Sequence, residues 1–420
     1  MTAVGLSALL AFSAASCYMP AETDSSDTAS VTSQETTSTA GFTEVTDFQN
    51  FNGYGERGDA IMDYFKEAFW KTDDRMKSEQ AKSDSVTLWG YASYMEACGE
   101  RMALHPDDQE VREEYIKALE NVEYYRTVWR TDDLQVYQCV PVESQAECFF
   151  DDDVWVVLEF IHAYTLLGDQ KWLDNAKGTI EFCYSGWDEE LDGGVYWKED
   201  DIGTDEACKN TCINAPLALA SAELYKITRE QKYLDWAIKL YDWTKAKLMD
   251  PEDYLMWDNI NVTTGNINRT TFTYNTGNMI ASAAMLYELT QDSSYLEDAK
   301  KMAEAAYTTF GGEIEKDTPA ESYYATGENS PWFQSSLLKG YIKLYEVDPS
   351  EVKYVKSFLT ALAHACSKNK DFRGFLNTDW KERSETGVIT NPDLLNQSGN
   401  ARVLLMLQNW KNAHGDALTQ

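Results

Sequence analysis

Three consecutive acidic residues, Asp151, Asp152 and Asp153, are the side chains of this sequence best suited to carry out chemistry. They lie between the aromatic pair Phe149–Phe150 and an apolar run that begins at Val154. Burial of unpaired carboxylates is costly, so these acids must either begin a helix in contact with water or line a polar cleft. A helix N-cap that complements the helix dipole would explain one of them. Two acids would still lack a role.

A pair of these acids supplies the groups that glycoside hydrolysis requires. Cleavage of an acetal needs one acid to protonate the leaving oxygen and one carboxylate to attack or to position water. Two close carboxylates acquire different pKa values, because ionisation of one raises the pKa of the other. Adjacent helical residues point about 100° apart, so both reach one sugar only at a helix entrance. The acids stand at such an entrance, after a long polar connection.

Further polar motifs recur in the long connections, and each has a structural and a functional interpretation. Gly193–Gly194 either form a plain hairpin turn or let a ligand approach the backbone, while Tyr196 and Trp197 could stack on a pyranose. Polar residues before later helices either cap them or bind sugar hydroxyls. Because all of these motifs are expected on one face, they favour a carbohydrate cleft. The other candidate binding residues are Lys209, Asn210, Asn214, Asp258, Tyr274 and Asn275.

Helix pairs repeat along the chain from about residue 55 onward. Apolar residues recur at three- and four-residue steps, and a turn followed by [Trp/Tyr]-Leu-[Asp/Glu]-x-Ala appears three times. Its first residues are Trp172, Tyr233 and Tyr295, at spacings of 61 and 62 residues. Weaker copies lie near Tyr115 and Tyr354. A fixed period of this length indicates stacked units of two helices and one long connection.

Six such units fit between residues 55 and 415, which predicts twelve helices in an all-α (α/α)6 toroid of six helical hairpins. An open solenoid of the TPR type is the alternative, but its repeats are about 34 residues long with short loops. We therefore expect a single closed domain over residues 49–420. The long connections should gather on one face, where loops on a rigid scaffold usually carry function. They span residues 140–150, 184–212, 249–274, 309–331 and 369–396.

Composition and charge indicate which classes of partner the protein can bind. The 70 acidic residues against 36 basic ones give a net charge of −34, which repels nucleic acid and anionic lipid and contributes to solubility. The 13 Trp and 25 Tyr residues suit sugar surfaces or helix packing. Neither Cys139/Cys148 nor Cys208/Cys212 has the spacing of a zinc site; local disulfides or buried thiols are both open. We expect no metal, no cofactor and a monomer.

The first seventeen residues have the pattern of an export signal. A short apolar run ends at Ser13-Ala14-Ala15-Ser16-Cys17, which fits a secretory signal with a small-residue cleavage site. Ending on cysteine is typical of a bacterial lipoprotein signal, in which Cys17 becomes lipidated. Residues 18–48 are rich in Ser and Thr and predict a disordered tether. We expect an exported protein, lipid-anchored at the outer membrane or cell surface, or on the periplasmic side, with no other contact to the membrane. A soluble secreted protein is the alternative.

The chain resembles glycoside hydrolase family 76, which includes bacterial endo-α-1,6-mannanases. The residues that carry the resemblance follow one another in order: Asp151-Asp152-x-x-Trp155, Ala163-Tyr164, Gly168-Asp169, Gly193-Gly194-x-x-Trp197, Lys209-Asn210-x-x-x-Asn214-Ala215, Tyr233-Leu234-Asp235-Trp236-Ala237 and Thr273-Tyr274-Asn275-x-Gly277. The resemblance implies an (α/α)6 barrel and a retaining mechanism. It implies Asp151 as nucleophile and Asp152 as general acid/base, with Trp155 in the substrate site and Asp153 outside the pair.

Three functions therefore compete. The first is a retaining endo-acting hydrolase of α-1,6-mannosidic bonds in mannan backbones, with the polysaccharide as its partner. The second keeps the fold but is a transglycosidase or another α-glycanase. The third is a non-catalytic, surface-anchored glycan-binding protein, which would not need a carboxylate pair.

Overall fold

The computed structural model describes residues 42–46, 48, 50–72, 74–311, 330–381 and 387–415. The predicted signal peptide, Cys17 and most of the predicted tether lie outside these ranges. Two residues of the predicted tether, Phe42 and Thr43, contact the first helix of the body. The Arg57 guanidinium lies 4.1 Å from the centre of the Phe42 ring, and the Thr43 hydroxyl donates a hydrogen bond to Glu56 at 2.6 Å.

Twelve α-helices and one small sheet make up the described part of the chain. The helices are α1 (Tyr54–Ala68), α2 (Leu88–Leu104), α3 (Gln109–Asn121), α4 (Phe150–Leu167), α5 (Gln170–Ser185), α6 (Thr211–Thr228), α7 (Gln231–Leu248), α8 (Thr273–Thr290), α9 (Ser293–Phe310), α10 (Pro331–Val347), α11 (Lys353–Lys368) and α12 (Leu394–His414). The strands are β1 (Cys208–Asn210), β2 (Trp257–Asn261) and β3 (Ile267–Thr271).

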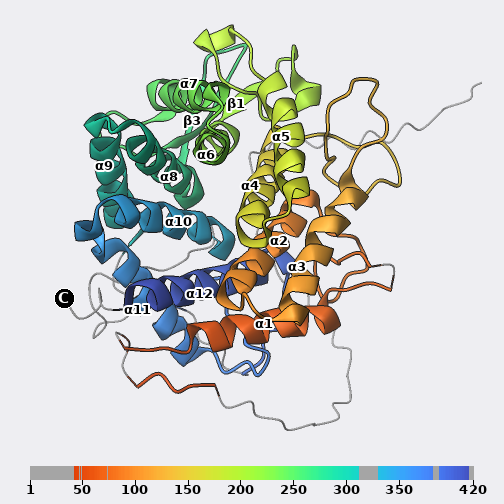
Figure 1. Ribbon diagram of the computed structural model, residues 1–420, viewed down its shortest axis with the longest axis vertical. Coiled ribbons are helices and arrows are strands. Elements are labelled where there is room, and N and C mark those ends of the chain that lie inside the picture. The colour runs from red at the N-terminus through yellow and green to blue at the C-terminus, as the bar shows by residue number, and fades with distance from the viewer. Residues whose placement is uncertain are drawn as a thin grey trace, which may run out of the picture. The chain divides into compact units, whose positions relative to one another are not determined.

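The even-numbered helices form a closed inner ring. Helices α2, α4, α6, α8, α10 and α12 contact one another in that order, and α12 packs back against α2. Helices α3, α5, α7, α9 and α11 each pack outside the inner helix that precedes them (Figure 1). The outer partner of α12 is α1, from the other end of the body. The (α/α)6 fold is confirmed, with the sixth helix pair made from the two ends of the chain.

Short turns join each inner helix to the following outer helix. The turns after α4, α6 and α8 begin with a residue in the left-handed conformation, namely Gly168, Arg229 and Gln291. This conformation ends a helix by turning its last carbonyls toward a new amide partner. The repeated aromatic residues Trp172, Tyr233 and Tyr295 all lie in the first turn of an outer helix, as the repeat predicts.

Long connections lead into the N-terminal ends of inner helices, such as residues 186–210 before α6 and residues 249–272 before α8. Within them lies an antiparallel sheet of order β1-β2-β3, with Cys208 opposite Asn261 and Asn210 opposite Asn259. Isolated bridges from Tyr196 to Lys209 and from Lys198 to Phe149 continue this pairing to the start of α4. Alternating hydrophobicity did not predict these strands, because they are three to five residues long and largely polar.

Close contact between the backbones of α8 and α10 tightens the inner ring. A Cβ atom at Gly277 would lie 2.5 Å from the Cα of Leu337, and one at Gly340 would collide with the carbonyl oxygen of Gly277. Only glycine permits this approach. The ring therefore brings the first turns of neighbouring inner helices, and the side chains they carry, close to one another.

Candidate active site

The three acids occupy the first turn of α4, where the sequence places them. Residue Phe149 precedes the helix, and its side chain supplies no cap. Two backbone hydrogen bonds fix this helix start to the next connection, from Phe150 N to Trp197 O at 3.0 Å and from Glu199 N to Cys148 O at 3.1 Å. The helix entrance is thus held by backbone pairing, which leaves the side chains of Asp151 and Asp152 available for another role.

Asp151 is held on one side by two donors from other elements. Its Oδ2 accepts hydrogen bonds from the indole Nε1 of Trp197 at 3.0 Å and from the thiol of Cys212 at 3.2 Å. Its Oδ1 accepts one from the backbone N–H of Asp152 at 3.1 Å. Asp151 is buried, whereas Asp152 is only half-buried. The two carboxyl groups therefore have different surroundings although they are adjacent in sequence.

These surroundings separate the protonation of the pair. Burial raises the pKa of Asp151 to about 6, while the Cys212 and Trp197 donors lower it. The pKa of Asp152 is raised well above its ordinary value by burial and then by the negative charge of Asp151. Hydrogen bonds to a carboxylate favour its charged form. Asp151 is accordingly the member of the pair that ionises first, and Asp152 is the one that keeps its proton.

Asp153 faces away from this pair. Its side chain is fully buried, and its Oδ1 accepts a hydrogen bond from the backbone N–H of Tyr137 at 3.0 Å. This bond ties α4 to the connection between α3 and α4. Burial raises the pKa of Asp153 well above its ordinary value. The prediction that Asp153 stands outside the pair is consistent with this position, and its role is to fix the connection.

Several predicted binding residues stabilise the loop between α5 and α6. Lys209 is fully buried and donates to Asp188 at 2.5 Å and to the carbonyls of Glu190 and Gly193 at 2.8 and 2.7 Å. Gly194 has a φ of +87°, and a Cβ atom there would collide with Trp243. These contacts hold the loop in one conformation.

Tyr196 and Asn214 also stabilise the loop between α5 and α6. The Tyr196 ring is 3% exposed, its hydroxyl donates to Asp188 at 2.6 Å, and Lys209 Nζ lies 4.7 Å from the ring centre. Neither face of this ring is open to a pyranose in the structure. The Asn214 amide exchanges hydrogen bonds with Val195 N and O, at 2.8 and 2.9 Å. Trp197, by contrast, is half-buried and turns its indole N–H to Asp151.

A second polar group lies where β2 meets the first turns of α6 and α8. Asp258 is 1% exposed, and burial raises its pKa to about 6. The amides of Asn259 and Asn268 donate to its Oδ2 at 2.8 and 3.1 Å. Asn210 pairs with Asn259 across the sheet, and Asn275 and Tyr274 are buried in the first turn of α8. These predicted residues therefore gather at neighbouring positions of the ring.

An aromatic layer lies directly beneath the acidic pair. Trp155, one turn below Asp151 on α4, packs edge-on against Trp332 with ring centres 5.1 Å apart. Tyr274 also contacts Trp332, at 5.9 Å. Trp155 is 3% exposed, so its ring is covered by this layer. Trp332 was not predicted, because it carries no repeat signature.

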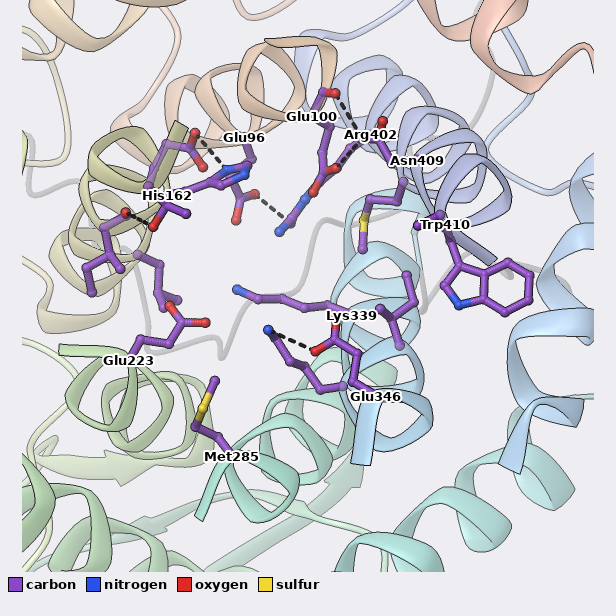
Figure 2. A pocket seen from close by; sticks show the side chains of 18 of the residues that line it. Glu96, Glu100, His162, Glu223, Met285, Lys339, Glu346, Arg402, Asn409 and Trp410 are labelled. Atoms are coloured by element: carbon purple, nitrogen blue, oxygen red, sulfur yellow. Dashed lines mark hydrogen bonds and ion pairs between the residues drawn. The ribbon is translucent and has the colours of Figure 1, made fainter. Parts of the chain in front are cut away.

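A cavity of about 540 Å³ occupies the other end of the inner ring. It is lined by the C-terminal halves of the inner helices, and the acidic pair does not reach it. Figure 2 shows Lys339 extending into this cavity and Glu96 paired with Arg402, at 2.8 Å. The Trp332 indole N–H also donates to Glu96, at 2.9 Å. The Trp332 ring thus packs against Trp155 and Tyr274, while its N–H binds Glu96, which lines the cavity.

Three remaining expectations concern cysteines, metals and membranes. Cys139, Cys148 and Cys208 are free thiols, so neither of the two local pairs forms a disulfide. Within the described ranges, no group of three or more His, Cys, Asp and Glu side chains is arranged to hold a metal ion. No helix in the part of the chain that the structure describes has the length and apolar character needed to span a membrane.

Cys212 is the contact of the acidic pair that the sequence did not single out. It lies between Asn210 and Asn214, inside the Lys209-Asn210-x-x-x-Asn214 motif. Its location in the first turn of α6, the inner helix next to α4, is the only signal that could have found it. The structure therefore places Cys212 against Asp151 and Trp332 against Trp155. The loop between α5 and α6 is stabilised by contacts of Gly193, Gly194, Tyr196, Lys209 and Asn214.

The fold defines the protein as an (α/α)6 toroid with an acidic pair at the mouth of its inner ring. The model of Glycosyl hydrolase family 76 matches residues 55–409, which is most of the chain. The chain belongs to this family.

Known proteins with related sequences and structures agree with this assignment. A mannan endo-1,6-alpha-mannosidase from Eremothecium gossypii is 25% identical over 217 residues, which are 48% of this chain and 47% of that protein. A family 76 α-mannanase from Bacteroides thetaiotaomicron has 24% identity and a TM-score of 0.78, covering 88% of this chain and 99% of that one. An inactive α-1,6-mannanase variant from Salegentibacter, in complex with α-1,6-mannotetrose, has 22% identity and a TM-score of 0.70, covering 84% and 98%. At these identities the structural likeness shows the fold.

Proposed function

We propose that this protein is a retaining, endo-acting glycoside hydrolase that cleaves α-1,6-mannosidic bonds in mannan backbones. The observation that carries the proposal is the adjacent pair Asp151 and Asp152 at a helix entrance, with Asp151 held by two donors and Asp152 kept protonated. Membership of family 76 supports the glycosidic bond as the target. The names of the related proteins, which include mannan endo-1,6-alpha-mannosidases, support α-1,6-mannan as the substrate.

The chemistry follows from the protonation of the pair. Ionised Asp151 attacks the anomeric carbon while protonated Asp152 gives its proton to the leaving glycosidic oxygen. The product of this step is a glycosyl ester on Asp151. Asp152, now ionised, takes a proton from water, whose oxygen attacks the anomeric carbon and releases Asp151. Two inversions at one carbon retain the anomeric configuration.

Isosteric replacement of the acids tests this assignment. Asp151→Asn and Asp152→Asn should each lower kcat on debranched α-1,6-mannan by about 10²- to 10⁴-fold or more, with unchanged circular dichroism. Asp153→Asn is the matched control, because Asn can still accept the hydrogen bond from Tyr137. It should keep the parent activity. Full activity in either of the first two variants would exclude the proposed roles.

The competing functions predict different products. A transglycosidase would lengthen added α-1,6-mannooligosaccharides, and another α-glycanase would release sugar from an α-1,4-linked glycan instead of the mannan. A non-catalytic binding protein would bind mannan saturably and release nothing at high protein concentration. The acidic pair favours hydrolysis, since binding alone does not require two carboxyl groups with separated pKa values.

We further infer that the protein is exported and anchored by a lipid on Cys17. The support is the apolar run before Ser13-Ala14-Ala15-Ser16-Cys17, which lies outside the described residues. Metabolic labelling with palmitate in a bacterial host should mark the parent protein and not the Cys17→Ala variant. Equal labelling of both would exclude this anchor.

A further inference from the structure

One oxygen of Asp151 carries two external hydrogen bonds, and the other carries none from outside its own helix turn. The Trp197 indole and the Cys212 thiol both donate to Oδ2, whereas among the described residues Oδ1 accepts a hydrogen bond only from the backbone N–H of Asp152. The two donors come from different segments, since Trp197 lies in the loop before β1 and Cys212 in the first turn of α6.

Both donors are themselves held in place. The backbone N–H of Trp197 donates to Cys208 O at 2.9 Å, and its carbonyl accepts the N–H of Phe150 at 3.0 Å. Its ring also packs against Phe149, with centres 5.0 Å apart. Cys212 is 1% exposed and lies in a helix. The carboxylate therefore cannot rotate freely about its last torsion without losing these two bonds.

We propose that Trp197 and Cys212 are positioning residues that hold Oδ2 of Asp151, so that Oδ1 is the oxygen that attacks the anomeric carbon. This inference rests on the proposed function. A nucleophile must approach its target along one direction, and a fixed carboxylate reaches this geometry without further ordering. The two donors also favour the ionised form of Asp151. Loss of either donor should therefore raise the pKa of Asp151.

The positioning role is tested by the pH dependence of kcat/KM on α-1,6-mannan. Trp197→Phe and Cys212→Ala each remove one donor, and each should move the acid limb upward by roughly 0.5–1 pH unit. Cys212→Ser keeps a hydrogen-bond donor at this position, so its acid limb should lie at the same pH as that of the parent. The loss should fall on kcat, by about 10- to 100-fold in the double variant, with KM little changed. Acid limbs that coincide with that of the parent in Trp197→Phe and Cys212→Ala would overturn the proposal.

A second readout does not depend on activity. The infrared S–H stretch of Cys212, obtained as the difference between the parent and Cys212→Ala, should lie at the low frequency of a thiol that donates to a carboxylate. In Asp151→Ala the same band should move to higher frequency. A band unaffected by Asp151→Ala would overturn the contact even where the mannan assay works. If the parent shows the low-frequency S–H band but no activity on mannan, the hydrogen bond is supported and the proposed substrate is excluded.

Discussion

At the scale of single residues, the different roles of three adjacent acids follow from what each one touches. Asp151 is held by Trp197 and Cys212, Asp152 is half-exposed beside that charge, and Asp153 binds the backbone of Tyr137. The sequence predicted a carboxylate pair within this run, and the resemblance to family 76 selected Asp151 and Asp152 as its members. The sequence could not predict the donors, because they are brought to Asp151 by loops whose course depends on long-range contacts.

The separated pKa values of the pair predict a bell-shaped dependence of kcat/KM on pH. Below a pH of about 6 the Asp151 carboxylate takes up a proton and the nucleophile is lost, so the rate falls. Above the pKa of Asp152, which burial and the charge of Asp151 raise, the acid is lost and the rate falls again. A rate that stays constant as the pH drops well below 6 would contradict the assignment of Asp151.

At the scale of elements, the repeat of aromatic residues predicted the helices and their pairing, while the sheet and the loop support were missed. The helices are visible in the sequence because each one buries one face, which places apolar residues at a helical period. Lys209 and Tyr196, which the sequence suggested as binding residues, stabilise the loop between α5 and α6 in the structure. A buried lysine that holds two carbonyls and a carboxylate has the same sequence signature as a ligand-binding one.

The close approach of α8 and α10 predicts a specific cost at Gly340. In Gly340→Ala the new methyl group meets the backbone of Gly277, and overpacking of this kind costs about 1–3 kcal/mol. The midpoint of urea unfolding should fall accordingly. Gly415→Ala is the control, since a Cβ atom there meets nothing within 4 Å. Equal midpoints for the two variants would show that the helices separate easily.

At the scale of the whole molecule, the ring is closed by helices from the two ends of the folded body. The Tyr54 hydroxyl donates to Leu359 O at 2.7 Å, Gly55 N donates to Gln408 at 3.2 Å, and Arg57 donates to Cys366 O at 3.2 Å. The sequence predicted six units in succession. It did not predict that α12 takes α1 as its partner, because no local pattern marks a pairing over such a separation.

This closure predicts the outcome of two truncations. A chain that begins at Phe42 keeps every contact of α1 described above and should retain the melting temperature and activity of the full-length chain. A chain that begins at Trp70 lacks α1 and leaves the outer face of α12 uncovered. It should lose cooperative unfolding, as measured by calorimetry. An intact cooperative transition in the shorter chain would show that the ring does not depend on α1.

The most direct test of the proposed function is proton NMR of the first products formed from debranched α-1,6-mannan. Attack by Asp151 followed by attack of water gives two inversions, so the new reducing ends should appear first as the α anomer. Their later conversion to the equilibrium mixture should follow at the rate of mutarotation. The initial appearance of the β anomer would contradict a covalent role for Asp151, and the absence of oligosaccharide products would contradict endo-action on this polysaccharide.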